Sequence, residues 1–478
     1  MDTNQQISIF TTASLPWMTG TAVNPLFRAA YLAKAGHGRV TLFIPWLSLK
    51  EQELVYPSGI TFSTPLEQEA YIRQWLEEKT GFSSDFNIRF YPGRFSTDKR
   101  SILAVGDNTE LVPDEEADIA VLEEPEHLTW YHHGRSWKTK FRRVIGVVHT
   151  NYIEYVKREK NGRVQAFFLN YVNNWVTQIY CHKVIRLSAA TQDLPRSVIC
   201  NVHGVGPKFL EVGLKKQEQQ KLGGRTFSKG AYYIGKMVWS KGYKELLQLL
   251  SEHQSKLADF EIDLYGNGED SVQIREAARK LSLTINVYPG RDHADPLFHE
   301  YKVFINPSTT DVVCTTTAEA LAMGKIVICA DHVSNDFFRE FPNCRTYKGS
   351  NGFPPIVRAA MESEPLPLSD ELRHRLSWEA ATERFVKAAE LNEQSLGGKV
   401  VSSYPSKGFM SISFEMSDIR RFVDDASAFM HNAASGIEPA RRAFGAIPKT
   451  LYPDEQQCRE LGLKPNGTNK SGKQWFKR

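Results

Sequence analysis

Residues 305–324 read Ile305-Asn-Pro-Ser-Thr-Thr-Asp-Val-Val-Cys-Thr-Thr-Thr-Ala-Glu-Ala-Leu-Ala-Met-Gly324, and this stretch decides the fold prediction. The apolar run 301–305 is typical of a buried strand, and residues 320–323 indicate a helix. A loop that leaves the carboxyl end of a strand and turns into a helix presents free backbone N–H groups and the positive end of the helix dipole, so it can bind an anion. The stretch therefore predicts a strand, an anion-binding loop and a helix in succession.

Three threonines and two acids supply the polar groups of this stretch. Thr315, Thr316 and Thr317 are residues that cap helices. Asp311 lies in the loop and Glu319 in the expected first turn, with seven residues between them. Helix-terminus amides suit a phosphate, and ionised carboxylates, which only accept hydrogen bonds, suit hydroxyl groups. The pattern favours a nucleotide sugar, although a capped helix with one solvated acid would have the same sequence features.

Short apolar runs alternate with helix-like stretches along both halves of the chain. The first series of predicted strands comprises residues 7–13, 39–45, 117–123, 144–149, 183–188 and 196–200. The second comprises residues 231–235, 260–265, 285–288, 302–306 and 325–329. Predicted helices cover residues 26–34 (with Pro25 at the first position behind an Asn24 cap), 65–78, 164–180 and 377–385, the last closing the second domain. This spacing predicts an α/β chain with two Rossmann-like domains of parallel strands.

The domain boundaries follow from composition. A Gly/Pro-rich break at residues 203–209 separates the two series, so we predict an N-terminal domain over 1–205 and a C-terminal domain over 206–395. Residues 396–478 begin with a Gly/Ser/Lys/Pro-rich linker and continue with a helical stretch. The segment 51–116 is longer than a crossover needs, so insertions are expected there.

Two lysines and two glycines follow strands of the second series. Lys236 and Lys241 lie where a strand leads into a helix, and cations there can neutralise a diphosphate both when bound and as a leaving group. Solvated surface lysines would look the same. Gly266 and Gly268 form a Gly-Asn-Gly turn after the next strand, either beside a nucleotide or as a plain tight turn.

Polar residues also follow strands of the first series. Gly20 lies in the turn after the first strand, where a glycine lets a ligand approach the backbone. His149 ends a strand that faces the expected cleft, and it could bind sugar hydroxyls, transfer a proton or be purely structural. The acids of residues 123–127 could accept the proton of a hydroxyl or lie on a solvated rim, and we favour the rim.

The bulk composition limits the partners and cofactors. The segment from Trp130 to Arg143 interleaves aromatic and basic residues, which suits an anionic membrane surface, RNA or an ordinary packed loop. No nucleic-acid motif accompanies it and the net charge is only +4, so we expect no nucleic acid. No apolar run is long enough to span a membrane. The six cysteines lack metal-ligand spacing, so neither a zinc site nor a disulfide framework is expected.

The acid pair and the lysine pair both resemble elements of one enzyme class. Asp311 and Glu319, inside Asn-Pro-Ser-x-x-Asp and Thr-x-x-x-Glu-Ala-Leu-Ala-x-Gly, resemble the acid–seven residues–acid signature of retaining nucleotide-sugar glycosyltransferases with the two-domain GT-B fold. Lys236 and Lys241 resemble the Gly-Arg-x-x-x-x-Lys-Gly element that binds the donor diphosphate in that class, with Lys236 in place of Arg. Asp311 likewise stands where Glu is usual.

Longer motifs make the resemblance more specific. They are similar to those of the digalactosyldiacylglycerol synthases of plants, and they cover residues 9–17, 19–31, 123–130, 148–152 and 308–319. The compact N-terminus is similar to the second, shorter type of that family. The resemblance implies a galactosyltransferase of galactolipid biosynthesis, which moves galactose from UDP-galactose to monogalactosyldiacylglycerol with retention and forms an α-1,6 link. A related GT-B enzyme with another donor or acceptor stays open, as does a non-catalytic membrane-binding protein on this fold.

The same resemblance assigns roles to residues. It implies that His149 and Asp311 are catalytic, Asp311 contacting the hexose. The donor-binding residues that it implies are Gly20, Lys236, Lys241, Gly266, Gly268, Thr315, Thr316, Thr317 and Glu319. UDP-galactose is then a substrate, and no cofactor or metal is expected because lysines and helix amides carry the charge. It further implies a galactolipid acceptor, a C-terminal helical segment within residues 396–478 that returns to the N-terminal domain, and a peripheral protein on the cytosolic face of the chloroplast outer envelope.

Overall fold

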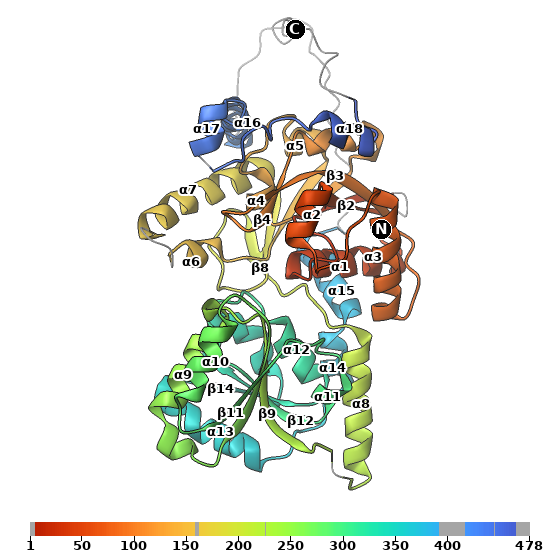
Figure 1. Ribbon diagram of the computed structural model, residues 1–478. Coiled ribbons are helices and arrows are strands. Elements are labelled where there is room, and N and C mark those ends of the chain that lie inside the picture. The colour runs from red at the N-terminus through yellow and green to blue at the C-terminus, as the bar shows by residue number, and fades with distance from the viewer. Residues whose placement is uncertain (1–4, 158–161, 225, 392–415, 444, 465–478) are drawn as a thin grey trace, which may run out of the picture.

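A computed structural model describes residues 5–157, 162–224, 226–391, 416–443 and 445–464. For residues 416–422 only the backbone is described. Figure 1 shows two lobes, one above the other. The upper lobe contains the N-terminal residues and the blue C-terminal helices, and the lower lobe contains the green and cyan elements between them.

The upper lobe is built on an eight-stranded sheet in the order β4-β3-β2-β1-β5-β6-β7-β8, parallel except for the antiparallel β3/β4 pair. Its strands are β1 (Gln6–Phe10), β2 (Arg39–Trp46), β3 (Asn87–Ser96), β4 (Ser101–Ala104), β5 (Ile119–Glu123), β6 (Arg143–Val148), β7 (Lys183–Arg186) and β8 (Ser197–Ile199). The six strands predicted for this half are all present. Most of their apolar runs are buried, as the central strands of a parallel sheet require when helices cover both faces.

The lower lobe is built on a six-stranded, fully parallel sheet in the order β11-β10-β9-β12-β13-β14. Its strands are β9 (Lys229–Ile234), β10 (Glu261–Tyr265), β11 (Thr284–Tyr288), β12 (Tyr301–Asn306), β13 (Ile326–Ala330) and β14 (Cys344–Tyr347). Five were predicted, whereas the short and partly polar β14 lacks the apolar run that marks the others. The two parallel sheets confirm the predicted α/β class with two Rossmann-like domains.

Helices connect the strands in both lobes. The α-helices of the upper lobe are α1 (Gly20–Lys34), α2 (Leu49–Val55), α3 (Pro65–Thr80), α4 (Pro125–Thr129), α5 (Trp137–Lys140), α6 (Tyr152–Lys157), α7 (Gly162–Tyr180), α15 (Trp378–Ala388), α16 (Met416–Ser435), α17 (Glu438–Ala443) and α18 (Glu455–Glu460). Those of the lower lobe are α8 (Pro207–Lys221), α9 (Tyr243–Glu252), α10 (Ser271–Arg279), α11 (Pro296–His299), α12 (Thr315–Ala322), α13 (Phe353–Glu362) and α14 (Asp370–Leu376). Short 3₁₀ helices are η1 (Asn108–Leu111), η2 (Asp114–Glu116), η3 (Trp239–Lys241), η4 (Gln254–Leu257), η5 (Val333–Glu340) and η6 (Ser350–Gly352).

The insertions expected between residues 51 and 116 comprise most of α2, α3, the β3–β4 hairpin, η1 and η2. Pro92 and Gly93 look like a turn in the sequence, yet both lie inside β3. A Cβ atom at Gly93 would come within 3.0 Å of side-chain atoms of both Ile102 and Pro45, so the glycine allows close packing in the sheet.

Helix α1 begins earlier than predicted. We expected Asn24 to cap a helix that starts at Pro25, but the helix starts at Gly20 and contains both residues. Proline has no N–H to donate to the carbonyl four residues back, here that of Thr21. The hydroxyl of Thr11 donates to this carbonyl instead. The Asn24 side chain donates to the Gly20 carbonyl at 2.9 Å rather than capping the helix.

The helix expected to close the second domain belongs to the upper lobe. In α15, Trp378 and Phe385 are buried in the core of the N-terminal sheet, and Trp378 stacks on Phe27 with ring centroids 5.4 Å apart. The chain therefore crosses between the lobes twice. The two crossings lie side by side, because the Val205 N–H donates to the Leu376 carbonyl at 2.8 Å.

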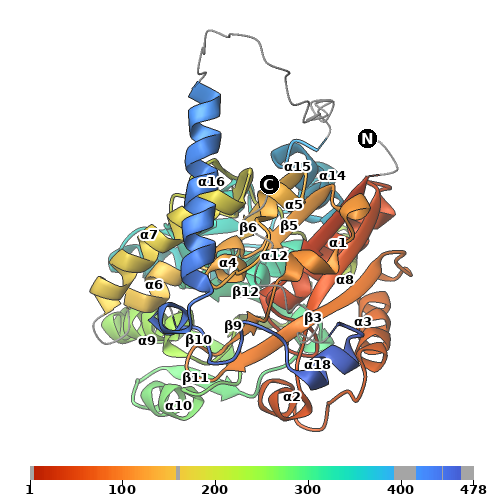
Figure 2. The same ribbon diagram turned by 90° about the horizontal axis from the view of Figure 1, so that it is seen from above.

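The C-terminal helices return to the upper lobe, as predicted. Figure 2 shows α16 running across the top of this lobe beside α7, and the Tyr180 hydroxyl lies 2.9 Å from His431 Nδ1 of α16. The predicted linker up to residue 415 and the chain end from 465 lie outside the described residues. Within the described ranges, no helix has the length and apolar character needed to cross a membrane.

Candidate active site

Each sheet has a switch point at which successive connections leave in opposite directions. In the upper sheet this point lies between β1 and β5, and in the lower sheet between β9 and β12. Open parallel sheets bind ligands outside the carboxyl ends of their strands at such points. Loops after β1, β5 and β9 carry Thr12, Glu124, Lys236 and Lys241, which line one cleft of about 1860 Å³ between the lobes. Because drug-sized ligands occupy pockets of about 300–1,000 Å³, the cleft has room for two substrates.

Lys241 is held in the cleft by an ion pair. Its Nζ lies 2.5 Å from Asp311 Oδ1, so the structure brings together two of the predicted site residues. Burial lowers the pKa of the Lys241 ammonium, but Asp311 and the Tyr155 hydroxyl raise it by more, and the pKa lies above its usual value. Tyr155 belongs to α6 of the upper lobe, so this permanent cation lies where the two lobes meet.

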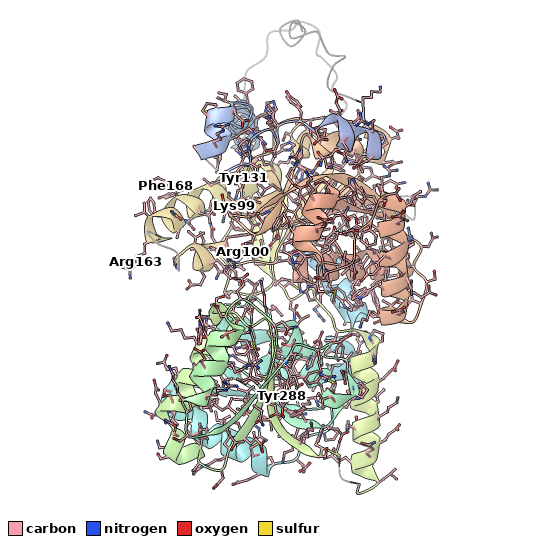
Figure 3. The ribbon with its side chains drawn as sticks, in the orientation of Figure 1. Lys99, Arg100, Tyr131, Arg163, Phe168 and Tyr288 are labelled. Carbon is pink, nitrogen blue, oxygen red and sulfur yellow. The ribbon has the colours of Figure 1, made fainter. Side chains whose placement is uncertain are left out.

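Lys236 is the more accessible of the two predicted cations. Its side chain is 61% exposed, and its Nζ lies 4.0 Å from Glu269 Oε1. Glu269 also pairs across the cleft with Arg100 of the upper lobe, which Figure 3 shows at the boundary between the lobes. Exposed ion pairs contribute only about 0–1 kcal/mol. Lys236 can therefore leave Glu269 for a phosphate group at little cost.

The loop between β12 and α12 has the predicted strand–loop–helix form, with one correction. Cys314, not a threonine, is the N-cap residue, and it makes no side-chain capping bond. Thr315, Thr316 and Thr317 are the first three helical residues, so their N–H groups have no carbonyl partner within the helix. The Thr317 hydroxyl accepts a hydrogen bond from the Asn306 amide at 3.1 Å. The prediction that the threonines cap the helix is wrong, but the start of α12 does present backbone N–H groups without a carbonyl partner in the helix.

Glu319 lies in the second turn of α12 rather than in the first. Its Oε2 is 2.7 Å from His293 Nδ1, and His293 Nε2 is 2.7 Å from the Tyr232 hydroxyl. This buried partner fixes the orientation of the carboxylate. His293 was not predicted, because a single histidine in the loop after β11 carries no signal that it pairs with a distant helix.

The two glycines of the Gly-Asn-Gly turn are required by packing. A Cβ atom at Gly266 would lie 2.1 Å from the Gly235 carbonyl oxygen, and one at Gly268 would lie 2.2 Å from the Met237 carbonyl oxygen. Neither contact is possible, so only glycine lets the loops after β9 and β10 touch. The glycines thereby support the segment that carries Lys236 and Lys241.

His149 belongs to a buried chain of polar groups in the upper lobe. Its Nε2 is hydrogen-bonded to Glu123 Oε2, and Glu123 Oε1 accepts from Arg28 Nε at 2.6 Å. Burial raises the pKa of Glu123, but Arg28 and His149 lower it by more, so the carboxylate is charged. The His149 ring is buried, 4.9 Å from the ring of His203, while the neighbouring Thr150 lines the cleft.

Gly20 occupies the first position of α1, next to the cleft-lining residues Thr19 and Thr21. A Cβ atom there would meet the Asn24 amide nitrogen at 3.5 Å, an ordinary contact. Packing within the chain therefore does not require this glycine, unlike Gly266.

The acids after β5 are buried, so the prediction of a solvated rim is wrong. Glu124 accepts hydrogen bonds from the hydroxyls of Thr12, at 2.8 Å, and Thr150. Burial raises the pKa of Glu126 to about 8, with a further contribution from the charge of Glu124. Burial lowers the pKa of His127 to about 4, so both Glu126 and His127 are neutral at pH 7.

His127 also lines the cleft. Its ring lies 5.2 Å from that of Trp130 and 6.2 Å from that of Tyr152. Within the described part of the chain, neither ring nitrogen of His127 has a hydrogen-bond partner. Buried polar groups are usually paired, so the two nitrogens, which are themselves buried, are unused hydrogen-bonding groups just beneath the cleft wall.

Three of the four Trp, Tyr and Phe rings in the segment from Trp130 to Arg143 are buried, and the fourth, that of Trp130, lines the cleft. Trp137 is 1% exposed and Phe141 is 2% exposed. Both pack on Phe10 of β1, with ring centroids 4.9 and 6.4 Å away. The prediction that these aromatic residues lie at the headgroup depth of a membrane is wrong, because composition alone does not separate a basic surface from a core segment with solvated lysines.

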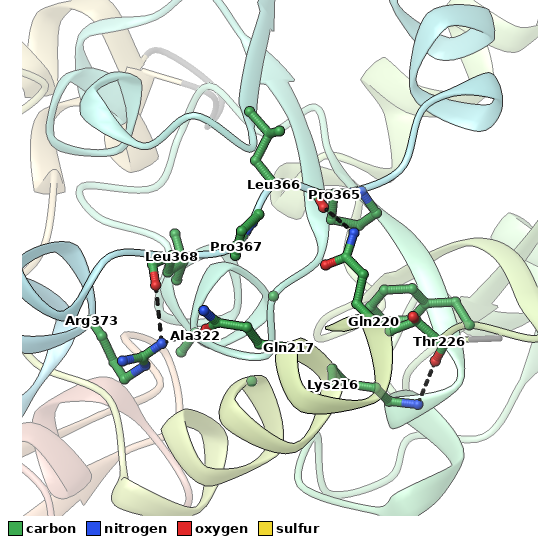
Figure 4. Close-up of a pocket in the computed structure, with 13 residues that line it drawn as sticks. Lys216, Gln217, Gln220, Thr226, Ala322, Pro365, Leu366, Pro367, Leu368 and Arg373 are labelled. Carbon is green, nitrogen blue, oxygen red and sulfur yellow. Dashed lines mark hydrogen bonds between the residues drawn. The ribbon is translucent and has the colours of Figure 1, made fainter. Parts of the chain in front are cut away.

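A further pocket on the lower lobe is too small for a substrate. It lies between α8 and the segment before α14 (Figure 4), where Gln220 Nε2 donates to the Pro365 carbonyl at 3.1 Å and Arg373 donates to the Leu368 carbonyl at 3.0 Å. Its volume of about 20 Å³ suits a water molecule. Among the described residues no group of three or more His, Cys, Asp or Glu side chains could hold a metal ion, and all six cysteines are free thiols.

A cleft between two Rossmann-like domains, with lysines on its lower wall, is the arrangement of a GT-B glycosyltransferase. Residues 228–341 match the model of the family described as glycosyl transferases group 1. Among solved structures, that of TarM covers 81% of this chain and all of its own with a TM-score of 0.53. At 12% identity, this similarity concerns the fold.

Two near relatives share almost the whole chain. Digalactosyldiacylglycerol synthase 2, chloroplastic, of Arabidopsis thaliana is 67% identical over 467 residues, which cover 97% of this chain and 98% of the relative. The protein of the same name from Glycine max is 65% identical over 463 residues, with 97% and 99% covered. The chain belongs to the digalactosyldiacylglycerol synthase family and is a galactolipid glycosyltransferase. The family resemblance expected from the sequence is thus confirmed.

Proposed function

We propose that the chain transfers galactose from UDP-galactose to monogalactosyldiacylglycerol and so forms digalactosyldiacylglycerol in galactolipid biosynthesis. Family membership supports the acceptor and the product. The assignment of UDP-galactose as the donor rests on one observation, the ion pair between Lys241 and Asp311 at the switch point of the lower sheet. The pair joins a permanent cation that lines the cleft to a carboxylate, and this supports the proposal because a sugar diphosphate has both anionic groups and hydroxyls.

The donor in this proposal lies along the lower wall. Lys236, Lys241 and the free amides at the start of α12 bind the diphosphate. Glu319, oriented by His293, accepts hydrogen bonds from the ribose hydroxyls, and Asp311 accepts hydrogen bonds from the hydroxyls of the hexose. Gly266 and Gly268 keep the lysine loop in place. Lysines and amides supply the positive charge, so the proposal contains no metal and no cofactor.

The transfer proceeds with retention, by attack on the same face of the sugar. The bond between the galactose C1 and the diphosphate oxygen breaks, and its electron pair leaves with UDP, whose charge Lys241 stabilises. The acceptor 6-hydroxyl oxygen bonds to C1 as its proton passes to the departing phosphate oxygen. This gives an α-1,6 link. His149, held by the charged Glu123, lies behind the cleft wall and supports the neighbouring Thr150, which lines it.

The acceptor galactose binds to the upper wall. His127 lines this wall, and its two unpaired ring nitrogens, buried just beneath it, become one donor and one acceptor for the sugar when the ring turns toward the cleft. Trp130 and Tyr152 flank it with aromatic surface, and Thr150 adds a hydroxyl. Aromatic faces with a few polar groups are suited to a sugar, which has apolar C–H faces and polar edges.

The protein acts as a peripheral membrane protein on the cytosolic face of the chloroplast outer envelope. The names of the relatives include the word chloroplastic, and the acceptor is a bilayer lipid. Because Trp137 and Phe141 are buried, this attachment uses a surface other than the one predicted from the sequence.

The test is a radiolabelled UDP-galactose assay with vesicles that contain monogalactosyldiacylglycerol. We expect the wild type to form digalactolipid that an α-galactosidase, but not a β-galactosidase, digests. Glu319→Ala should lose the activity, whereas Glu276→Ala, an exposed control on α10, should retain it. If UDP bound but no lipid product formed, another acceptor would replace this one. If UDP did not bind, the donor assignment would be wrong.

A further inference from the structure

Helix α7 carries a stripe of exposed apolar side chains. Val164, Phe167, Phe168 and Tyr171 are 62%, 59%, 63% and 60% exposed. Their spacing of three and four residues places them on one face of the helix. The opposite face, which includes Val176, is buried in the upper lobe. The helix is therefore apolar on both sides, although only one side packs against the protein.

The stripe is a continuous surface rather than a set of isolated residues. The ring of Phe167 lies 5.8 Å from that of Phe168 and 5.0 Å from that of Tyr171. Figure 3 shows Phe168 at the outer end of α7, directed away from the body of the lobe. Contiguous exposed apolar surfaces of this kind mark contacts with a partner or a membrane, whereas single exposed apolar residues are ordinary.

The position of the stripe identifies its partner. Phe168 is part of the stripe and also lines the cleft, as do Leu169 and Val172 on the adjoining face of α7. The apolar surface thus continues from the outside of the lobe into the substrate cleft. A bilayer lipid whose headgroup enters the cleft while its acyl chains stay in the membrane would follow this surface. Arg163, exposed at the start of the helix, adds a cation at the level of the lipid phosphates.

We propose that the outer face of α7, formed by Val164, Phe167, Phe168 and Tyr171, is the surface with which the protein docks on a lipid bilayer. Docking turns the mouth of the cleft toward the headgroups, so the acceptor reaches the upper wall without leaving the membrane. The choice of a bilayer as the partner rests on the proposed lipid acceptor.

The test compares two double variants of the full chain. Phe167→Ser/Tyr171→Ser removes two exposed rings of the stripe that, unlike Phe168, are not among the described residues lining the cleft. Leu54→Ser/Leu66→Ser removes two exposed leucines from α2 and α3, which lie at the other side of the same lobe in Figure 1. Binding is measured by sedimentation with vesicles of monogalactosyldiacylglycerol and phosphatidylglycerol. Activity is measured with these vesicles and with galactosylglycerol, the soluble headgroup without acyl chains. Calorimetry with UDP verifies folding.

We expect the α7 variant to bind vesicles more weakly by roughly tenfold or more, because each of the two aromatic side chains contributes apolar area that docking buries. Its turnover of vesicle lipid should fall in parallel, while its turnover of galactosylglycerol and its affinity for UDP stay at the wild-type level. The leucine control should match the wild type throughout.

Vesicle binding by the α7 variant at the wild-type level would overturn the docking proposal, and so would an equal loss in the leucine control. A fall in galactosylglycerol turnover as large as the fall with vesicles would assign α7 to the substrate site instead. A wild type that binds vesicles but galactosylates neither acceptor would refute the proposed function and leave the docking surface standing.

Discussion

Glu126 allows a quantitative test of the electrostatics at the upper wall of the cleft. Its pKa is raised by burial from 4.5 to about 8. Between these two pH values the folded protein binds more protons at this site than the unfolded chain does. The free energy of unfolding therefore falls as the pH rises, by about 1.4 kcal/mol per pH unit. From pH 4.5 to pH 7 the loss amounts to about 3 kcal/mol.

Glu126→Gln removes this pH dependence, because the amide has the shape of the protonated acid and does not titrate. We expect the variant and the wild type to have similar free energies of unfolding near pH 4.5. At pH 7 the variant should be more stable by about 3 kcal/mol. Urea unfolding followed by tryptophan fluorescence at pH 5, 6, 7 and 8 measures the difference.

Glu115→Gln is the matched control, since Glu115 is an exposed glutamate of the same lobe. It should leave the pH dependence of unfolding unchanged. A difference between Glu126→Gln and the wild type that stays flat from pH 5 to pH 8 would refute the reasoning. Glu126 would then be ionised in the folded protein, and burial would not be the dominant influence on its pKa.

Three substitutions test other parts of the site. Gly266→Ala forces a methyl group against the Gly235 carbonyl oxygen, and we expect it to destabilise the lower lobe by about 1–3 kcal/mol. Thermal unfolding measures this loss, and a midpoint equal to that of the wild type would show that the methyl group does not clash. Asp311→Asn should lower the turnover of UDP-galactose by roughly 10²–10³-fold and weaken UDP binding far less, in initial rates and calorimetry; an equal loss in both would assign Asp311 to the diphosphate. His127→Ala should raise the KM for the lipid acceptor by roughly tenfold without changing the KM for UDP-galactose, and a change confined to the donor would place His127 on the wrong wall.

The strands and most helices could be predicted because their signals lie in residues that are adjacent in the sequence. The central strands of both sheets are continuous apolar runs, and the stretch 305–324 carries its strand, loop and helix signals within twenty residues. The start of α1 was missed because Pro25 leaves the Thr21 carbonyl without its helical N–H partner. The hydroxyl of Thr11 donates to that carbonyl instead, and Thr11 lies outside the helix, so the helical pattern gave no sign of it. The location of α15 was missed for a related reason. Its helical period is clear, but Trp378 packs on Phe27 at the other end of the chain.

The residues of the candidate site likewise fall into those with a local sequence signal and those without one. The anion loop and both lysines could be found from strand-end position and residue type. The partners that orient them, Tyr155 for Lys241 and His293 for Glu319, come from other elements and leave no local signal. Burial was the largest source of error. The acids after β5 and the aromatic residues between Trp130 and Arg143 look like surface residues in composition, whereas the sheet covers them.

The two adjacent chain crossings form a double connection between the lobes. A single linker would allow one lobe to rotate about several axes. Here, however, a hydrogen bond between Val205 and Leu376 joins the two crossing segments. A Cβ atom at Gly204 would lie only 2.5 Å from the Trp378 nitrogen, so glycine keeps the two segments in contact. We therefore expect any movement of one lobe against the other to turn about this double connection, because sliding the two segments past each other would break the hydrogen bond between Val205 and Leu376.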